Sequence, residues 1–165
     1  MSNEVFPDRD MEHDDKIAWV VETNGWCAEP VAAQEDPPTP GYTYSIGFEL
    51  TYAHPEVVIF GLQPVAARGL MDMMAEYLGG GGSIPEGVFV GLLDNDLPAA
   101  MLPMDVDEYA DMFASAAHFH RDSTFRLSQF VWPDRNGLLP WNDGYDERLR
   151  LAQPVIGALA ELDGI

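Results

Sequence analysis

Helices are the first elements that the pattern of hydrophobic and polar positions predicts. Hydrophobic residues recur at helical spacing in three stretches of the chain, residues 12–24, 64–78 and 105–120. Gly25 follows the first stretch directly, and glycine is the usual residue just past a helix end. A shorter helix is predicted over residues 154–162. We therefore expect helices near both ends of the chain and in its middle.

Strands are predicted where hydrophobic residues alternate with polar ones or form short unbroken runs. Residues 42–50 alternate with period two, with large hydrophobic side chains on one face and small or polar ones on the other. Residues 57–62 are a continuous hydrophobic run, which is typical of a central strand covered on both faces. Further strands are predicted at residues 87–93, 97–102 and 125–132, the first two joined as a hairpin through Asp94–Asp96. The proline-rich segment 34–41 is predicted to be a loop.

These elements together predict an α+β fold. We expect a mainly antiparallel sheet of about five to six strands, covered by helices on one face. The length of 165 residues fits one domain. The predicted organisation is a flexible acidic tail at residues 1–11, followed by a single α+β domain over residues 12–165.

The charge balance of the chain narrows the classes of partner. Asp and Glu number 28 against 8 Lys and Arg, which gives a formal net charge of -20. A surface of this sign repels phosphate groups, so the main partner is expected to be neither nucleic acid nor a membrane surface. Two explanations stay open for the charge: adaptation of the host, or steering toward a basic partner.

The number of cysteines and the hydropathy of the chain indicate in which cellular compartment we expect the protein. Cys27 is the single cysteine, so an internal disulfide is excluded, and it is expected to be a small buried residue. The sequence shows neither a secretory signal nor a hydrophobic run long enough to span a membrane. We therefore predict a cytoplasmic location. Nothing in the sequence identifies a cofactor or an oligomeric state.

The first segment that can carry chemistry is His54-Pro55-Glu56, which precedes the predicted central strand. Pro55 stiffens this turn and fixes a histidine and a carboxylate at the start of the strand. Such a pair can serve as a general base, as metal ligands or as a ligand clamp, and His54 and Glu56 are our candidate catalytic residues. The alternative is a turn whose histidine simply binds a nearby carbonyl group.

The second segment, residues 129–141, contains two tryptophans around a tight Asn-Gly turn. We expect the turn to bring the two indoles together as the apolar walls of a pocket, with Asp134 as acid or hydrogen-bond acceptor. The candidate ligand-binding residues are Tyr44, Gln129, Trp132, Asn136 and Trp141. The alternative is that both tryptophans belong to the core and that Asp134 only caps the turn.

A histidine metal site is not predicted. His118 and His120 are two positions apart on a predicted helix, and such side chains point about 200° away from each other. His120 falls on the hydrophobic stripe of that helix, whereas His118 lies opposite. Two ligands so placed cannot bind the same ion.

Four segments in combination carry a resemblance to a known family. Gly25-Trp26, residues 42–48, residues 54–62 and residues 129–141 resemble the bacterial domain-of-unknown-function family 4262. The resemblance extends from about residue 13 to residue 153. It implies a small, single-domain, bacterial cytoplasmic protein, and it implies no reaction.

Two functions from different classes follow. The first is a small-molecule pocket, binding or catalytic, formed jointly by His54-Pro55-Glu56 and Trp132-Pro133-Asp134…Trp141. In this pocket His54 or Glu56 would be the base, and the pocket requires His54 and Trp132 to lie within roughly 15 Å of each other. The second is an acidic interaction module, of the immunity or adaptor type, whose acidic helix at residues 105–111 docks a basic protein. The sequence does not decide whether the protein is an enzyme.

Overall fold

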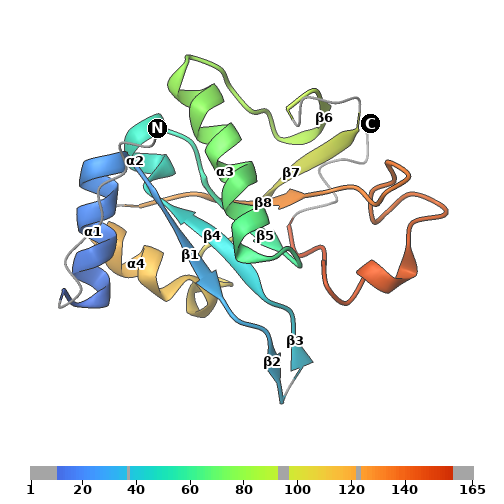
Figure 1. Ribbon diagram of the computed structural model, residues 1–165, viewed down its shortest axis with the longest axis horizontal. Helices are drawn as coiled ribbons and strands as arrows, with labels where there is room; N and C mark the ends of the chain where they lie inside the picture. The colour runs from blue at the N-terminus through green and yellow to red at the C-terminus, as the bar shows by residue number, and fades with distance from the viewer. Residues whose placement is uncertain (1–10, 37, 93–96, 122–123, 158–165) are drawn as a thin grey trace.

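The computed structural model describes residues 11–36, 38–92, 97–121 and 124–157 of the chain (Figure 1). Its central feature is a six-stranded sheet. The strands are β1 (Cys27–Val31), β4 (Tyr42–Ile46), β5 (Glu56–Phe60), β6 (Gly87–Val90), β7 (Pro98–Met104) and β8 (Leu127–Val131). Their order across the sheet is β1-β4-β5-β8-β7-β6. Neighbouring strands are antiparallel, except that β5 and β8 run parallel.

The helices complete an α+β fold, as predicted. They are α1 (His13–Asn24), α2 (Phe48–Tyr52), α3 (Pro64–Gly79) and α4 (Ala114–His120), with short 3₁₀ turns η1 (Ala110–Phe113) and η2 (Glu147–Leu149). A small hairpin of β2 (Gln34–Glu35) and β3 (Pro38–Thr39) projects below the main sheet (Figure 1).

Helices cover both faces of the sheet, whereas we expected them on one face. Val57 and Ile59 of β5 belong to a core cluster with the buried residues of α3. Val58 and Phe60, which alternate with them, belong to a second cluster with residues of α1 and α4. Figure 1 shows α3 in front of the sheet, and α1 and α4 at its left. The continuous hydrophobic run of β5 is therefore explained by burial on both sides, as predicted for a central strand.

The strand predicted over residues 42–50 is too long. It ends at Ile46, because Gly47 adopts a left-handed backbone with φ of 117° and the short helix α2 begins at Phe48. A β-carbon at Gly47 would lie 2.7 Å from the carbonyl oxygen of Gly25. The close approach lets Phe48 turn inward, where its ring contacts Trp26 at 5.3 Å between centroids. The change from strand to helix at Gly47 does not interrupt the alternation of hydrophobic and polar residues, so that alternation could not predict it.

In three other segments the type of structure differs from the prediction. The segment 34–41, predicted as a loop, contains the β2–β3 hairpin. Within 105–120, Asp105 accepts the backbone N–H groups of Asp107 and Glu108, so the segment starts as a turn and becomes helical only in η1 and α4. Of the helix predicted at 154–162, residues 154–157 are not helical, and residues 158–162 lie outside the described part of the chain. The turn Asp94–Asp96 of the predicted hairpin also lies outside it, while its strands β6 and β7 pair as expected.

Candidate functional site

The two motif segments lie at opposite ends of β5. Because β5 and β8 are parallel, with Glu56 paired to Leu127, the start of β8 lies beside the start of β5. Trp132 follows the end of β8, and its indole N–H donates to the carbonyl of Phe60, the last residue of β5, at 2.8 Å. β5 itself spans roughly 13 Å from Glu56 to Phe60, and His54 lies two residues before its start. The structure therefore does not bring His54 and Trp132 together in one of its hollows.

The two indoles also lie on opposite faces of the sheet. Trp132 packs against the cluster that α3 covers, which includes Phe130 and Met101. Trp141 packs against Leu102 and Val131, which alternate with those residues along β7 and β8. The expectation that they form two walls of one pocket is corrected, because successive side chains of a strand point to opposite faces.

Asp134 organises the turn that follows β8. Its Oδ1 accepts the backbone N–H groups of Asn136 and Leu138, each at 2.9 Å, and its Oδ2 accepts that of Asp146 at 3.0 Å. The backbone N–H of Leu138 is the main cause that lowers the pKa of Asp134, followed by those of Asp146 and Asn136. A carboxylate that accepts three backbone donors stays ionised and holds a corner. This is the turn-capping role that we kept as the alternative.

Gln129 is occupied in a similar way. Its amide nitrogen donates to the carbonyl of Pro154 at 2.7 Å, and its oxygen accepts the backbone N–H groups of Ile156 and Gly157. The side chain therefore fastens the segment after η2 across the sheet. Both polar atoms of the side chain are thus engaged within the described residues.

The remaining ligand-binding candidates are scattered. Tyr44 is buried under the α1 and α4 layer, 5.0 Å from the ring of Phe113, and burial raises its pKa to about 12. Asn136 is exposed in the Asp134 turn. Neither residue lies with His54 in one of the hollows described below.

Glu56 is the centre of a buried polar cluster. Its Oε1 accepts from the hydroxyl of Ser45 at 2.8 Å and from the backbone N–H of Phe48 at 3.0 Å. Its Oε2 accepts from the backbone N–H of Gly47 and from Nε2 of His120, both at 2.8 Å. A carboxylate has about four acceptor positions, so these donors saturate it. Glu56 thus joins β4, α2, β5 and α4 rather than facing a ligand.

His120 is the buried residue that we missed. Its ring is stacked on Phe125 at 4.6 Å between centroids, and its side chain is 6% exposed. The sequence contained a signal, because His120 falls on the hydrophobic stripe of its helix. A polar side chain at such a position needs a buried hydrogen-bond partner. Glu56, at the start of a buried strand, needs one as well, and the two residues bind each other.

His54 is the motif residue whose chemistry the fold leaves unused. Its Nδ1 lies 2.8 Å from the carbonyl oxygen of Pro55, the one hydrogen-bond partner of the ring among the described residues. The side chain lines a hollow of about 270 Å³ together with Tyr52, Glu86, Arg126 and Ser128. Burial is the main cause that lowers the pKa of His54, and the positive charge of Arg126 acts in the same direction.

Arg126 is held at the same hollow by its neighbours. Its Nε and Nη2 bind the carboxylate of Glu49, and Nη2 also donates to the carbonyl of Ala53 at 2.8 Å. The hydrogen bond to Glu49 raises the pKa of Arg126. The guanidinium is therefore fixed next to the turn that carries His54.

A family model described as a domain of unknown function (DUF4262) matches residues 20–146. The chain belongs to the DUF4262 family. The match includes both motif segments of this DUF4262 chain, the six-stranded sheet, α2, α3, α4 and the last five residues of α1. No curated protein and no solved structure matches the chain significantly. The family relationship identifies the domain and assigns no activity to it.

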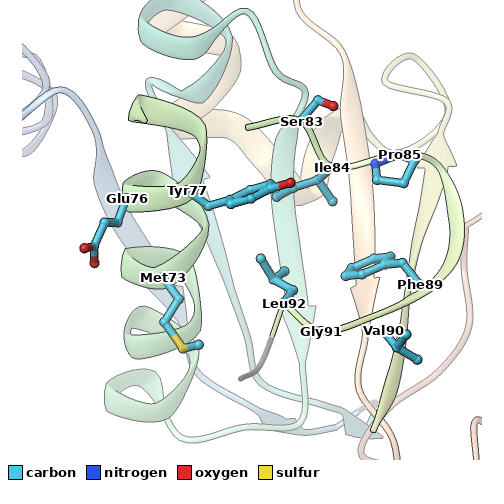
Figure 2. A pocket seen from close by; sticks show the side chains of 10 residues that line it. All are labelled: Met73, Glu76, Tyr77, Ser83, Ile84, Pro85, Phe89, Val90, Gly91 and Leu92. Carbon is cyan, nitrogen blue, oxygen red and sulfur yellow. The ribbon is translucent and has the colours of Figure 1, made fainter. Parts of the chain in front are cut away.

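A second hollow of the DUF4262 chain, of about 680 Å³, lies between α3 and β6. Figure 2 shows the rings of Tyr77 and Phe89 and the side chain of Leu92 turned into this space. Glu76 is the one charged side chain in its lining. A third hollow, of about 840 Å³, lies where β5 leads into α3.

Among the described residues of the DUF4262 chain, no three His, Cys, Asp or Glu side chains converge in a way that would hold a metal ion. None of the helices described has the length and hydrophobicity needed to cross a membrane. Cys27, expected to be buried, is partly exposed, and burial of its sulfur raises its pKa to about 12.

Proposed function

We propose that the DUF4262 chain binds a small polar molecule in the hollow beside His54. The observation that carries the proposal is the contact of Nδ1 of His54 with the carbonyl oxygen of Pro55. A carbonyl oxygen accepts only, so Nδ1 carries the hydrogen and Nε2 of the neutral ring carries a lone pair. A histidine fixed in this tautomer accepts a hydrogen bond or a proton from a bound molecule.

The electrostatics of the hollow support this role. The lowered pKa of His54 keeps the ring neutral near pH 7, which is the form that accepts. Perturbed histidines in clefts are candidates for functional sites. The acceptor property of His54 is thus present under ordinary conditions rather than only at high pH.

Arg126 supplies the complementary group. Its Nε and Nη2 are engaged by Glu49 and Ala53, which leaves Nη1 to donate to an acceptor on the ligand. The hollow is smaller than the ~300–1,000 Å³ of typical drug-sized sites, so its ligand is small. The chemistry fits a compact molecule with one hydrogen-bond donor for His54 and one acceptor for Arg126.

The test compares His54→Asn with the wild-type protein. An asparagine amide can still donate to the Pro55 carbonyl but lacks the acceptor at Nε2, so the turn is kept and the proposed role is removed. Glycolate, glycine and acetamide are suitable probes, with binding followed by the ¹H–¹³C resonance of the His54 ring or by calorimetry. We expect at least one probe to bind wild type and to lose about tenfold or more in affinity in His54→Asn.

The matched control is His118→Asn, because His118 is exposed and lies outside this hollow, with Asp14 at 3.5 Å as its ion-pair partner among the described residues. Its affinity for the probe should equal that of wild type. Equal affinity of His54→Asn and wild type, or no binding of any of the three probes, would refute the proposed site.

The acidic interaction module remains a second candidate function, and one observation favours it. Asp105, Asp107, Glu108 and Asp111 are all exposed on one short segment between β7 and α4. A basic protein would be steered toward them, with an association rate that falls as salt is added. The quadruple amide variant of these residues should weaken a basic partner without changing probe binding at His54. The reverse pattern would exclude the module.

A further inference from the structure

The largest of the three hollows lies at the end of β5 opposite to His54. It has a volume of about 840 Å³ and is bounded by the end of β1, the β2–β3 hairpin, the start of α3 and residues 151–152. β5 forms the parallel pair of the sheet with β8. In open α/β sheets, ligands bind outside the carboxyl ends of the parallel strands. The groove lies at the carboxyl end of β5, one strand of the parallel pair of this mainly antiparallel sheet.

The lining of this groove is mainly apolar, and none of the described residues in it is charged. That is unusual for a chain with 28 acidic and 8 basic residues. Four prolines lie in the lining: Pro30, Pro38, Pro40 and Pro64. Proline rings are rigid, so the walls lose little conformational entropy when a ligand binds. The groove suits an uncharged, largely apolar molecule.

Thr43 provides the polar contact within this wall. It lines the groove, is 1% exposed, and its hydroxyl is the buried side-chain oxygen or nitrogen without a hydrogen-bond partner among the described residues. The hydroxyl of Ser45, two residues along β4, donates to Glu56 and accepts the backbone N–H of Val57. Buried hydroxyls are normally satisfied in this way, so an unpaired one beside a groove indicates a missing partner.

The start of α3 adds a second donor region. Its N-cap residue Gln63 makes no side-chain capping bond, and Gln63 and Pro64 both line the groove. The backbone N–H groups of a helix start are partly positive and attract an oxygen atom. The net charge of -20 opposes a full negative charge there, which leaves a neutral oxygen as the matching group.

We infer that this groove is a second small-molecule site, for an uncharged, mainly apolar molecule whose single carbonyl or hydroxyl oxygen accepts a hydrogen bond from Thr43. The site is independent of the one at His54, which lies at the other end of β5. Its ligand is of a different class, apolar rather than polar.

The test uses three probes of similar size: acetophenone, ethylbenzene and benzoate. Binding to the full chain is followed by ligand-observed and protein-observed NMR. Wild type should bind acetophenone at least about tenfold more tightly than ethylbenzene, which lacks the oxygen, and more tightly than benzoate, which is charged. In Thr43→Val, which replaces the hydroxyl by a methyl group of similar shape, acetophenone and ethylbenzene should bind with equal affinity.

Two controls make the outcome specific. Thr43→Ser retains the hydroxyl and should retain the preference for acetophenone. Thr23→Val changes an exposed threonine on α1, outside the groove, and should behave as wild type. His54→Asn should leave all three affinities unchanged, which separates this site from the first. A preference for acetophenone that persists in Thr43→Val, tighter binding of benzoate, or no binding of any probe to wild type would overturn the inference.

Discussion

Replacement of Glu56 by glutamine tests how the polar cluster holds the sheet to α2 and α4. Two donors point at each carboxylate oxygen, from Ser45 and Phe48 on one and from Gly47 and His120 on the other. A glutamine amide presents its NH₂ group to one of these pairs in either orientation. Two hydrogen bonds to a charged group are lost, at ~1.5–3 kcal/mol each, so the free energy of unfolding should fall by about 4 kcal/mol.

Urea unfolding followed by tryptophan fluorescence measures this loss. With an m-value of about 2 kcal/mol/M, the midpoint for Glu56→Gln should fall by about 2 M. The control is Glu49→Gln, whose carboxylate binds the largely exposed Arg126 and should contribute less than about 1 kcal/mol. A loss below about 1 kcal/mol in Glu56→Gln would show that the four contacts do not stabilise the fold as we describe.

Three further changes have defined outcomes. Thr43→Val removes an unpaired buried hydroxyl and should raise the free energy of unfolding by about 1 kcal/mol, measured by the same urea titration; a loss would indicate a partner for the hydroxyl. Gly47→Ala puts a β-carbon 2.7 Å from the Gly25 carbonyl at a φ of 117° and should lower the free energy of unfolding by at least about 2 kcal/mol, whereas Gly69→Ala, with open space around it, should not. The pKa of His54 is lowered from 6.5 in the folded protein, so the unfolded chain binds the proton more readily. The stability that His54 contributes is therefore complete above pH 6.5 and falls as the pH drops toward the folded pKa. His54→Asn should reduce this dependence of the free energy of unfolding on pH.

Local periodicity was sufficient for much of the fold. The helical spacing around Ile17 and Val21 and the cap at Gly25 gave α1 almost to the residue, and the unbroken run after Glu56 gave the central strand. These features are set by side chains close together in the sequence. The turn at Gly47 was not predicted, because it depends on a close approach of its backbone to Gly25, which lies 22 positions earlier in the sequence.

The candidate site depended on strand order, which local patterns do not contain. Both motif segments were identified, and together with Gly25-Trp26 and residues 42–48 they indicated the DUF4262 family. Whether Trp132 meets His54 or Phe60 is decided by the parallel pairing of β5 with β8, and that pairing places Trp132 at Phe60. The contact between Glu56 and His120 joins residues 64 positions apart and has the same origin. Most of the polar motif residues thus serve the fold, and His54 is the residue for which we propose a bound molecule.

The central claim is that His54 is a neutral histidine with its acceptor nitrogen available to a bound molecule. Long-range ¹H–¹⁵N NMR of the histidine rings at pH 7 tests it most directly. We predict a protonated Nδ1 and an unprotonated Nε2 for His54, with the Nε2 resonance moving when a binding probe is added. A hydrogen on Nε2, a doubly protonated ring at this pH, or an Nε2 resonance that ignores a bound probe would contradict the account.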